Sequence, residues 1–263
     1  MEIVQFDISG KFAHFRKYYA NNTALTYSLP PRTTVMGMLA AIMGAPKDSY
    51  YEELASDRIR IGIAIRTPIK KTFHRLNFLS IKSLGDIRKS FDSDFRGMAG
   101  NPIQTPFEVV TGNDVKKDEI VYRIFLGSTE SGKATFAALK KRLLERDWVY
   151  APTFGIANFH ASPGNVMCHP ENNVVENQGS SARLSFDSAV NADNVLSLIF
   201  EKEPDAFVEE ELLPADFLAN GNREVARMVR ALFTSGGIPL KVEITGTYHT
   251  IQAQSSLQTI QFL

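Results

Sequence analysis

The order of the sequence patterns predicts an α+β fold in two parts. Residues 1–160 are expected to form a ferredoxin-like (RRM-like) domain, and residues 161–263 a smaller β-rich domain. In the first part, the patterns follow one another as strand, helix, strand, strand, strand, helix. This is the split βαβ order with an extra hairpin. A turn-rich stretch and a change from basic to acidic composition near residue 160 predict the boundary.

Alternation of apolar and polar residues predicts the strands. The clearest case is Arg58–Thr67, in which isoleucine occupies every second position from 59 to 65. The same period predicts strands over Glu2–Ser9, Glu119–Leu126 and Leu240–Ile251. Ile69–Lys82 is expected to be a second, less regular strand region after the isoleucine strand.

Helical spacing predicts two main helices. The segment Val35–Met43 is apolar on nearly every side, so this helix is expected to be buried, with Thr33 or Thr34 as its N-cap. A second helix is expected over residues 129–147, with a serine or threonine cap and basic residues on its outer faces. Two shorter helices are expected at Asn194–Glu201 and Arg223–Phe233.

Length and composition exclude several classes of protein. The chain has 263 residues, of which 44% are hydrophobic, enough to build a sizeable core. Its longest apolar run, Val35–Met43, has nine residues, whereas a transmembrane helix needs about 20. No secretory leader is visible, and the single cysteine, Cys168, cannot form an intrachain disulfide. The expected location is therefore the cytoplasm, with no membrane partner.

The net charge of zero conceals an asymmetry between the two halves of the chain. Residues 11–110 hold 15 Lys and Arg against 8 Asp and Glu, whereas residues 171–230 hold 5 against 12. Nucleic-acid binding responds to the local surface and not to the total charge. The first half is thus suited to a polyanion, although both halves are equally compatible with ordinary solvated charge.

The sequence lacks the short motifs of common phosphate-binding, metal and hydrolytic sites. It contains no Walker A loop, no G-x-G-x-x-G, no C-x-x-C, no H-E-x-x-H and no G-x-S-x-G. Cys168 and His169, with His160, are the nearest approach to a metal site, but adjacent residues rarely bind one ion and no fourth ligand is suitably spaced. We therefore expect no metal, no cofactor and no catalytic residue of these classes.

The loop Phe12–Arg32 interleaves cations with aromatic rings. Arg16 and Lys17 stand next to Tyr18 and a second tyrosine, and Asn22 offers hydrogen bonds to base edges. Single-stranded RNA is bound by such combinations, because cations contact phosphates and flat rings stack on unpaired bases. The alternative is that the rings pack beneath the loop and the cations are solvated.

A second basic stretch, Lys70–Arg75, contains His74 beside Lys71. Metal-independent RNA cleavage needs a base, an acid and a cation, which His74, a tyrosine and Lys71 could supply. The simpler interpretation, which we favour, is a basic strand edge with an ordinary surface histidine, because nothing in the sequence determines how these groups face one another.

The first 45 residues are similar to the N-terminal signature of a known family. The similar stretches are Phe6–Arg16 (FDISGKFAHFR), Leu25–Tyr27, Pro30–Thr33 and the run from Gly37 to Gly44. They resemble the CRISPR-associated Cas-five family, and especially the subunit of the type I-B effector complex. From Arg58 to Gly155 only the order of elements is compatible with the family.

This resemblance implies a fold, a function and partners. Family members have a modified ferredoxin-like domain of the repeat-associated mysterious protein superfamily, with a protruding hairpin, the thumb, that wedges against RNA. In Cascade-type complexes they cap the 5′ repeat-derived handle of the guide RNA (crRNA) and contact the large subunit and a Cas-seven-type backbone subunit. The implied function is a non-catalytic RNA-binding subunit in antiviral defence, which meets target DNA through the assembled complex. The alternative is a metal-independent endoribonuclease, as in the type I-C branch.

By element order, the thumb is expected at the irregular stretch Ser83–Pro106. About 24 residues without periodicity are unusual in a compact domain, and this stretch is expected to be an arm that orders on RNA. The residues expected to contact RNA are Lys11, His14, Arg16, Lys17, Tyr18, Asn22, Tyr27, Arg32, Lys71, His74, Arg75, Arg88, Lys89 and Arg96.

Overall fold

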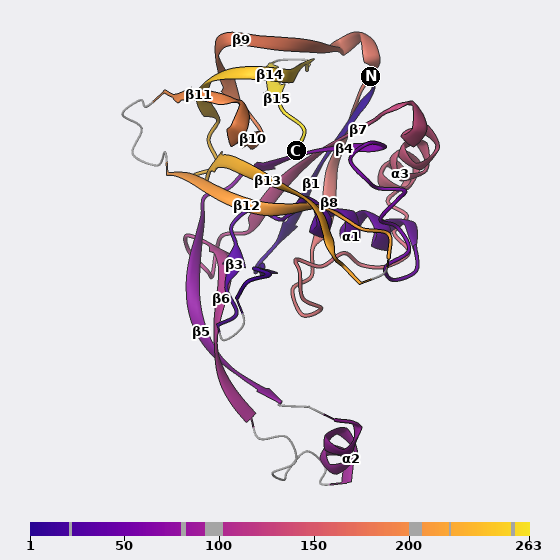
Figure 1. Cartoon of the computed structure of the whole chain (residues 1–263), viewed down its shortest axis with the longest axis vertical. Coiled ribbons are helices and arrows are strands. Elements are labelled where there is room, and N and C mark those ends of the chain that lie inside the picture. The colour runs from indigo at the N-terminus through magenta and orange to yellow at the C-terminus, as the bar shows by residue number, and fades with distance from the viewer. Residues whose placement is uncertain (21–22, 80–82, 93–101, 200–206, 221, 254–255) are drawn as a thin grey trace.

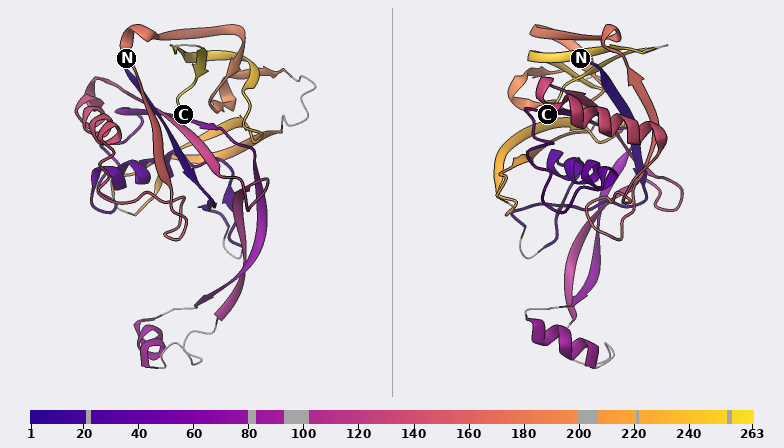
Figure 2. Two further views of the ribbon diagram at one scale, coloured as in Figure 1. Left: turned by 180° about the vertical axis from the view of Figure 1, so that it is seen from behind. Right: turned by 90° about the vertical axis from the view of Figure 1, so that its right-hand side faces the viewer.

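The protein consists of a body of packed sheets and helices and a long hairpin that leads away from it (Figure 1). The computed structural model describes residues 1–20, 23–79, 83–92, 102–199, 207–220, 222–253 and 256–263. In two further views the hairpin again extends beyond the body, and a short helix lies at its far end (Figure 2). None of the helices in the described ranges is long and apolar enough to cross a membrane.

The centre of the body is an antiparallel sheet with the strand order β4-β7-β1-β8. Helix α1 (Arg32–Met43) connects β1 to β4, and helix α3 (Lys133–Glu145), preceded by the short η1 (Glu130–Gly132), connects β7 to β8. Each helical connection therefore passes over one intervening strand. The strands are β1 (Ile3–Gly10), β4 (Ile59–Ile65), β7 (Ile120–Ser128) and β8 (Ser162–His169). The strands predicted at Glu2–Ser9, Arg58–Thr67 and Glu119–Leu126 are confirmed as β1, β4 and β7. The two main helices are confirmed as α1 and α3.

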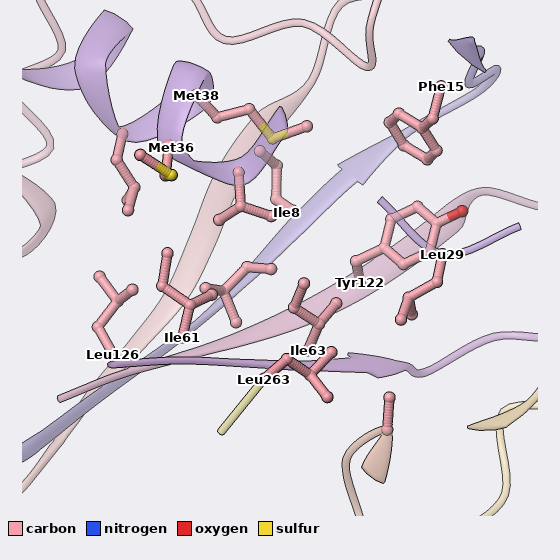
Figure 3. Packing of buried hydrophobic residues seen from close by; sticks show 14 of the residues in the cluster. Ile8, Phe15, Leu29, Met36, Met38, Ile61, Ile63, Tyr122, Leu126 and Leu263 are labelled. Atoms are coloured by element: carbon pink, nitrogen blue, oxygen red, sulfur yellow. The ribbon is translucent and has the colours of Figure 1, made fainter. Parts of the chain in front are cut away.

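The main core lies between this sheet and the two helices. Every second residue of β1 and β4 points to the helices, and Val4, Phe6 and Ile8 share one buried cluster with apolar residues of α1 and α3. Figure 3 shows Ile61 of β4 beneath Met36 of α1. Each such side chain contributes about 1.5–3 kcal/mol when fully buried. The alternation in the sequence thus fixes which face of the sheet the helices cover.

The helix caps differ from the prediction. Pro31 is the N-cap of α1, with no side-chain cap, and its carbonyl accepts from the N–H groups of Thr34 and Val35 at 2.8 and 3.1 Å. The Thr129 hydroxyl, expected to cap the second helix, donates instead to the carbonyl of Asp57 at 2.6 Å. Pro31 thus caps α1 through its backbone, and the Thr129 hydroxyl makes a tertiary contact, so the sequence predicted each helix but not its cap.

The central sheet continues past the expected boundary at residue 160. Strand β8 begins at Ser162 and pairs with β1 along its length, from Ser9↔Ser162 to Ile3↔His169. The main core also includes Leu213 and Phe233 from the second segment. Part of the second segment therefore shares one core with the first 160 residues.

The later strands form two further sheets, one with the order β10-β13-β12 and one in which β14 pairs with β9, β11 and β15. Val174, Ile251 and Ile260 cover the second face of the central sheet at Ile3 and Phe125. The elements are η2 (Glu171–Asn173), β9 (Val174–Phe186), β10 (Val190–Asn191), η3 (Ala192–Asn194), β11 (Val195–Leu198), β12 (Val208–Phe217), β13 (Val225–Thr234), β14 (Leu240–Gln252) and β15 (Leu257–Ile260). The expectation of a strand at Leu240–Ile251 is confirmed.

The prediction of two short helices in this segment is wrong. Residues 195–198 and 225–234 are the strands β11 and β13. In β13, Val229, Ala231 and Phe233 belong to the main core, whereas Leu232 belongs to a second cluster on the other face. Because both faces of the strand are buried, its apolar residues are not confined to every second position and simulate helical spacing.

The hairpin consists of β5 (Ile69–Leu79) and β6 (Pro102–Gly112), paired in register from Ile69↔Gly112 to Leu79↔Pro102. Helix α2 (Leu84–Asp92) lies between them. The interpretation of 83–106 as irregular is therefore wrong for α2 and for the start of β6, while residues 93–101 lie outside the described residues. Pro106 explains why the sequence did not predict this strand, because proline is rare inside strands. Its carbonyl accepts from the Ala24 N–H at 3.0 Å, so its missing N–H faces that side and leaves the ladder to β5 intact.

Arg32 connects α1 to the later strands from a fully buried position. Its Nη1 lies 2.6 Å from Asp216 Oδ1, and its Nη2 donates to the carbonyls of Leu54 and Ile59 at 2.8 and 2.6 Å. Burial lowers the pKa of Arg32 to about 10, and Asp216 opposes this shift. The side chain is charged at neutral pH and is not available to a phosphate, which corrects its expected role as an RNA contact.

We expect Arg32→Met to lower the free energy of unfolding by about 3 kcal/mol or more, because it leaves a buried carboxylate without its main partner. Urea denaturation of the purified chain measures this. The control is Arg227→Met, which removes the more exposed partner of Asp216, with 40% of its side chain accessible. The control should cost about 1 kcal/mol or less. Equal decreases for the two variants would contradict the structural role of Arg32.

Candidate nucleic-acid interface

The loop between β1 and α1 is attached to the base of the hairpin. It contains the two short paired strands β2 (Phe15–Arg16) and β3 (Thr26–Tyr27). Ala13 bridges to Val110 of β6, and Ala24 bridges to Phe107. The loop and the hairpin therefore form one continuous structure, although about 80 residues separate them in the sequence.

Part of the predicted RNA-binding set is exposed on this loop. Arg16 is exposed, and its guanidinium donates to the Ala20 carbonyl at 3.2 Å. The rings of Tyr18 and Tyr19 are 57% and 56% exposed and lie edge to face, with centroids 5.2 Å apart. These residues offer a cation and two flat faces to solvent, as predicted. Asn22 lies outside the described residues.

Two other predicted contacts, His14 and Tyr27, are buried. The Nδ1 of His14 lies 2.7 Å from the Glu108 carbonyl, so it carries a proton and donates, and the ring stacks on Phe107 at a centroid distance of 4.0 Å. Burial lowers the pKa of His14, with a smaller contribution from Arg16. Burial also raises the pKa of Tyr27. Both side chains support the loop from below, so neither lies on the exposed surface of the loop.

The lysines that were predicted to contact RNA interact instead with oxygen atoms of the protein itself. Lys17 and Lys71 lie 3.6 and 3.4 Å from Glu211 Oε1, and Lys71 also lies 3.6 Å from Glu209. Lys11 donates to the carbonyls of residues 116 and 118 at 3.1 and 2.9 Å. These three lysines connect the loop and the hairpin to the body, and little of their charge is left for a polyanion.

Glu211 is the acceptor that organises this connection. It is 6% exposed, and its carboxylate accepts from the N–H groups of Ser28 and Leu29 at 3.0 and 3.3 Å. Burial raises the pKa of Glu211, and Lys71 and Lys17 oppose that shift. The sequence carries no local signal for this role, because the partners of Glu211 lie about 140 to 190 residues away. The only hint is the opposite charge of the two halves.

The exposed part of β5 carries basic and apolar side chains in turn. Phe73, His74, Arg75 and Leu76 are all exposed, Phe73 by 61%. Phe73 and Arg75 lie on one face of the hairpin, and His74 and Leu76 on the other. At the far end, Arg88 of α2 is exposed. The side chain of Lys89 and all of Arg96 lie outside the described part of the chain.

The strand separates the groups proposed for RNA cleavage. Lys71 and His74 are three residues apart on β5, so they point to opposite faces of the hairpin. The His74 ring lies 3.1 Å from the Thr72 hydroxyl, and Lys71 is paired with carboxylates of β12. This arrangement does not bring an acid, a base and a cation to one phosphate.

A pocket of about 570 Å³ opens beside the loop. Its walls come from β2, α1, the segment 151–156 and the turn between β12 and β13. Arg16 and Arg223 supply its cations, and Phe107 of the hairpin forms part of its wall. Arg223 was not predicted as a site residue, because no motif surrounds it.

The residues considered for a metal do not form a cluster. His169 directs its Nε2 to Gln5 Oε1 at 3.2 Å, and Cys168, its neighbour on β8, points to the other face. Among the residues that the structure describes, no three His, Cys, Asp or Glu side chains are placed to hold a metal ion.

Residues 3–108 match the model of the family described as CRISPR-associated protein (Cas_Cas5). This part of the chain is therefore similar to the Cas-five family. The matched region includes β1, the loop, α1, β4 and the first half of the hairpin. The resemblance seen in the first 45 residues is thereby confirmed. No curated protein matches the chain.

Two solved structures that are similar to this chain belong to CRISPR proteins. A CRISPR protein from Archaeoglobus fulgidus matches with a TM-score of 0.57 and 14% sequence identity, over 100% of each chain. A chain of a CRISPR RNA-guided surveillance complex matches with a TM-score of 0.46 and 14% identity, over 91% of this chain and 90% of that chain. The first of these shows a common fold.

We expect the stability of the protein to fall as the pH drops below about 6.5, in part because of His14. Burial holds the pKa of His14 below its ordinary value, so the unfolded chain binds the proton more readily and acid favours unfolding. His14→Asn retains a donor for the Glu108 carbonyl but does not titrate. Urea denaturation at pH 7.5 and 5.5 should show a smaller pH dependence for this variant.

The matched control is Phe107→Leu, which removes the ring under His14 and adds no titratable group. It should lower the free energy of unfolding by a similar amount at both pH values. If His14→Asn keeps the full pH dependence of the wild type, protonation of His14 does not limit stability in acid.

Proposed function

We propose that this protein is a non-catalytic crRNA-binding subunit of a type I CRISPR Cascade effector complex, and that it caps the 5′ repeat-derived handle of the guide RNA. The observation that carries the proposal is the attachment of the loop to β6. It attaches the loop with the exposed Arg16, Tyr18 and Tyr19 to the hairpin that carries the exposed Phe73 and Arg75. Cations and unstacked rings along one continuous surface are what single-stranded RNA requires.

The fold supports this proposal. The strand order β4-β7-β1-β8 with helices α1 and α3 as crossovers is the order of a ferredoxin-like domain, with the β5–β6 hairpin inserted between β4 and β7. We infer that this inserted hairpin is the thumb that the family resemblance implies. It is about eleven residue pairs long and projects from the body (Figure 1).

The proposed partners follow from the same resemblance. We infer contacts with the Cascade large subunit and with a Cas-seven-type backbone subunit, and contact with target DNA through the assembled complex in the cytoplasm. The similarity of the first 45 residues favours the type I-B subunit within the family. Helix α2, at the far end of the hairpin, lies away from the body in Figure 2, a position suited to reach such neighbours.

The second candidate function is a metal-independent endoribonuclease that processes precursor guide RNA, as in the type I-C branch. One observation favours it, the exposed His74 on a basic strand. The opposite orientation of Lys71 and the pairing of Lys71 with Glu209 and Glu211 argue against it. We therefore propose the non-catalytic role.

We expect Arg16→Glu combined with Arg75→Glu to weaken binding of single-stranded guide RNA and to make its salt dependence shallower. For each phosphate that the variant no longer neutralises, the slope of log K against log salt should change by about 0.7. Fluorescence anisotropy in a salt titration measures both quantities. The matched control is Arg183→Glu on β9, an arginine whose side chain is 78% exposed in a different sheet.

The control should retain the affinity and the slope of the wild type. If the double variant also does so, the loop and the hairpin do not contact RNA, and the proposed function loses its main support.

We also expect the purified protein to leave repeat RNA intact in the absence of divalent metal, because its candidate acid, base and cation do not converge. Gel analysis of labelled repeat RNA after incubation with a chelator tests this. Metal-free cleavage by the wild type that His74→Ala abolishes would instead establish the endoribonuclease.

A further inference from the structure

Two buried carboxylates from distant parts of the chain bind the backbone of one short segment of the loop. The segment is Thr26–Leu29, which contains β3 and leads toward α1. Glu108 of β6 accepts from the Thr26 N–H at 2.9 Å. Glu211 of β12 accepts from the N–H groups of residues 28 and 29, at 3.0 and 3.3 Å. A buried N–H group without an acceptor is costly, so each carboxylate fixes the backbone that it meets.

All three polar groups of Glu108 face the loop. Its N–H donates to the Ala24 carbonyl at 2.9 Å, and its carbonyl accepts from the His14 ring at 2.7 Å. Its carboxylate accepts from the Thr26 N–H, and the residue is 9% exposed. Glu108 therefore serves the loop through its main chain and its side chain together, and it offers little surface to a ligand.

Glu108 also has a fixed place in the hairpin. It lies directly opposite Phe73 in the ladder between β5 and β6, so the two side chains are on the same face. Phe73 is exposed, and Arg75 is the next residue on that face. At this level β3 lies beside β6, where the hairpin leaves the body (Figure 1). One residue thus connects the loop to the part of the hairpin that carries an exposed ring and a cation.

The body holds the other end of the same segment. Glu211 is buried and belongs to the sheet β10-β13-β12. The Tyr122 hydroxyl, from the central sheet, donates to the Ser28 carbonyl at 2.7 Å. Because the hairpin and two sheets of the body all bind Thr26–Leu29, this segment is fixed relative to the hairpin and to the body.

The exposed side chains of the loop take their position from this segment. Arg16 of β2 lies directly opposite Thr26 of β3, and the Phe15 N–H donates to the Thr26 hydroxyl at 2.8 Å. The exposed Tyr18 and Tyr19 follow Arg16 within three residues of the chain. A shift of Thr26 would therefore move the exposed cation and both rings relative to the hairpin.

The loop and the hairpin are thus two surfaces held at a constant separation. Such surfaces bind one strand more tightly than either does alone, because the second contact is intramolecular. We infer that Glu108 is a positioning residue, which holds the exposed side chains of the loop in a fixed orientation to Phe73 and Arg75, so that one RNA strand binds both surfaces. The inference rests on the proposed function and names a residue that connects its two surfaces. Glu108 itself does not contact the RNA.

The test measures how the affinity depends on the length of the RNA, with the full chain. The probes are fluorescein-labelled single-stranded RNAs of mixed sequence, about 4 to 16 nucleotides long, the range of single-strand site sizes. A short RNA reaches one surface and a longer one reaches both, so the affinity of the wild type should rise at least about tenfold over this range. Glu108→Met removes the acceptor of the Thr26 N–H. It should lose most of this rise and keep the wild-type affinity for the shortest RNA.

Further variants separate positioning from folding, and thermal melting shows which of them are folded. Glu108→Asp keeps the charge but shortens the side chain by a methylene group, which withdraws the carboxylate from the Thr26 N–H, so it should lose part of the rise. Glu108→Gln retains an oxygen acceptor for this N–H and should restore the rise. The matched control is Glu145→Met, at an exposed glutamate of α3, which should bind RNAs of every length like the wild type.

The outcomes separate this inference from the proposed function. If the folded Glu108→Asp and Glu108→Met variants keep the full rise with RNA length, the positioning role is overturned and RNA binding stands. If they weaken binding of short and long RNAs by the same factor, Glu108 contributes only to stability, and the inference is again overturned. If the wild type binds RNA without any rise, the two surfaces do not share a strand and the inference fails. If the wild type binds RNA of no length, the proposed function itself fails.

Discussion

The structure depends on carboxylates of β12 that meet cations of the first half of the chain inside the protein. Glu211 accepts from the loop backbone and pairs with Lys17 and Lys71, and Asp216 pairs with the fully buried Arg32. A buried charge without a partner is costly, so these groups must meet in one arrangement. The opposite charge surpluses of the two halves, which suggested a polyanion for the first half, are in part consumed by this internal pairing.

That constraint decides which cations remain for a ligand. Lys17 and Lys71 look equivalent to Arg16 and Arg75 in the sequence, but only the arginines are free of β12 carboxylates. The same contacts hold the loop against the base of the hairpin. The internal charge pairing thus removes some cations from the surface and fixes the positions of the others, so that Arg16 lies both on the exposed loop and in the pocket wall.

The sequence predicted those parts of the fold whose burial follows a simple period. The isoleucine strand β4 and the apolar helix α1 are of this kind. It failed at β13, which is buried on both faces, and at β6, where proline concealed a strand whose missing N–H faces away from β5. In the candidate site, Arg16 and Tyr18 are exposed, as a contact with RNA requires, whereas the burial of His14, Tyr27 and Arg32 was not predicted. Composition does not reveal whether a ring or a guanidinium lies above or below a loop; only contacts with β6 and β12, far along the chain, decide it.

The later strands also bear on why the proposed RNA interface is placed on the loop and the hairpin. A four-stranded sheet with helices on one face commonly offers its other face to RNA. Here that face is covered, because Ile251 and Ile260 pack on Ile3 and Phe125. Two of its charged residues pair with each other: Arg123 donates two hydrogen bonds to Asp7, at 2.7 and 3.0 Å. With the sheet face closed by apolar packing and by this ion pair, the exposed rings and cations occur instead at the end of the sheet, where β1 leads into the loop and β4 leads into the hairpin.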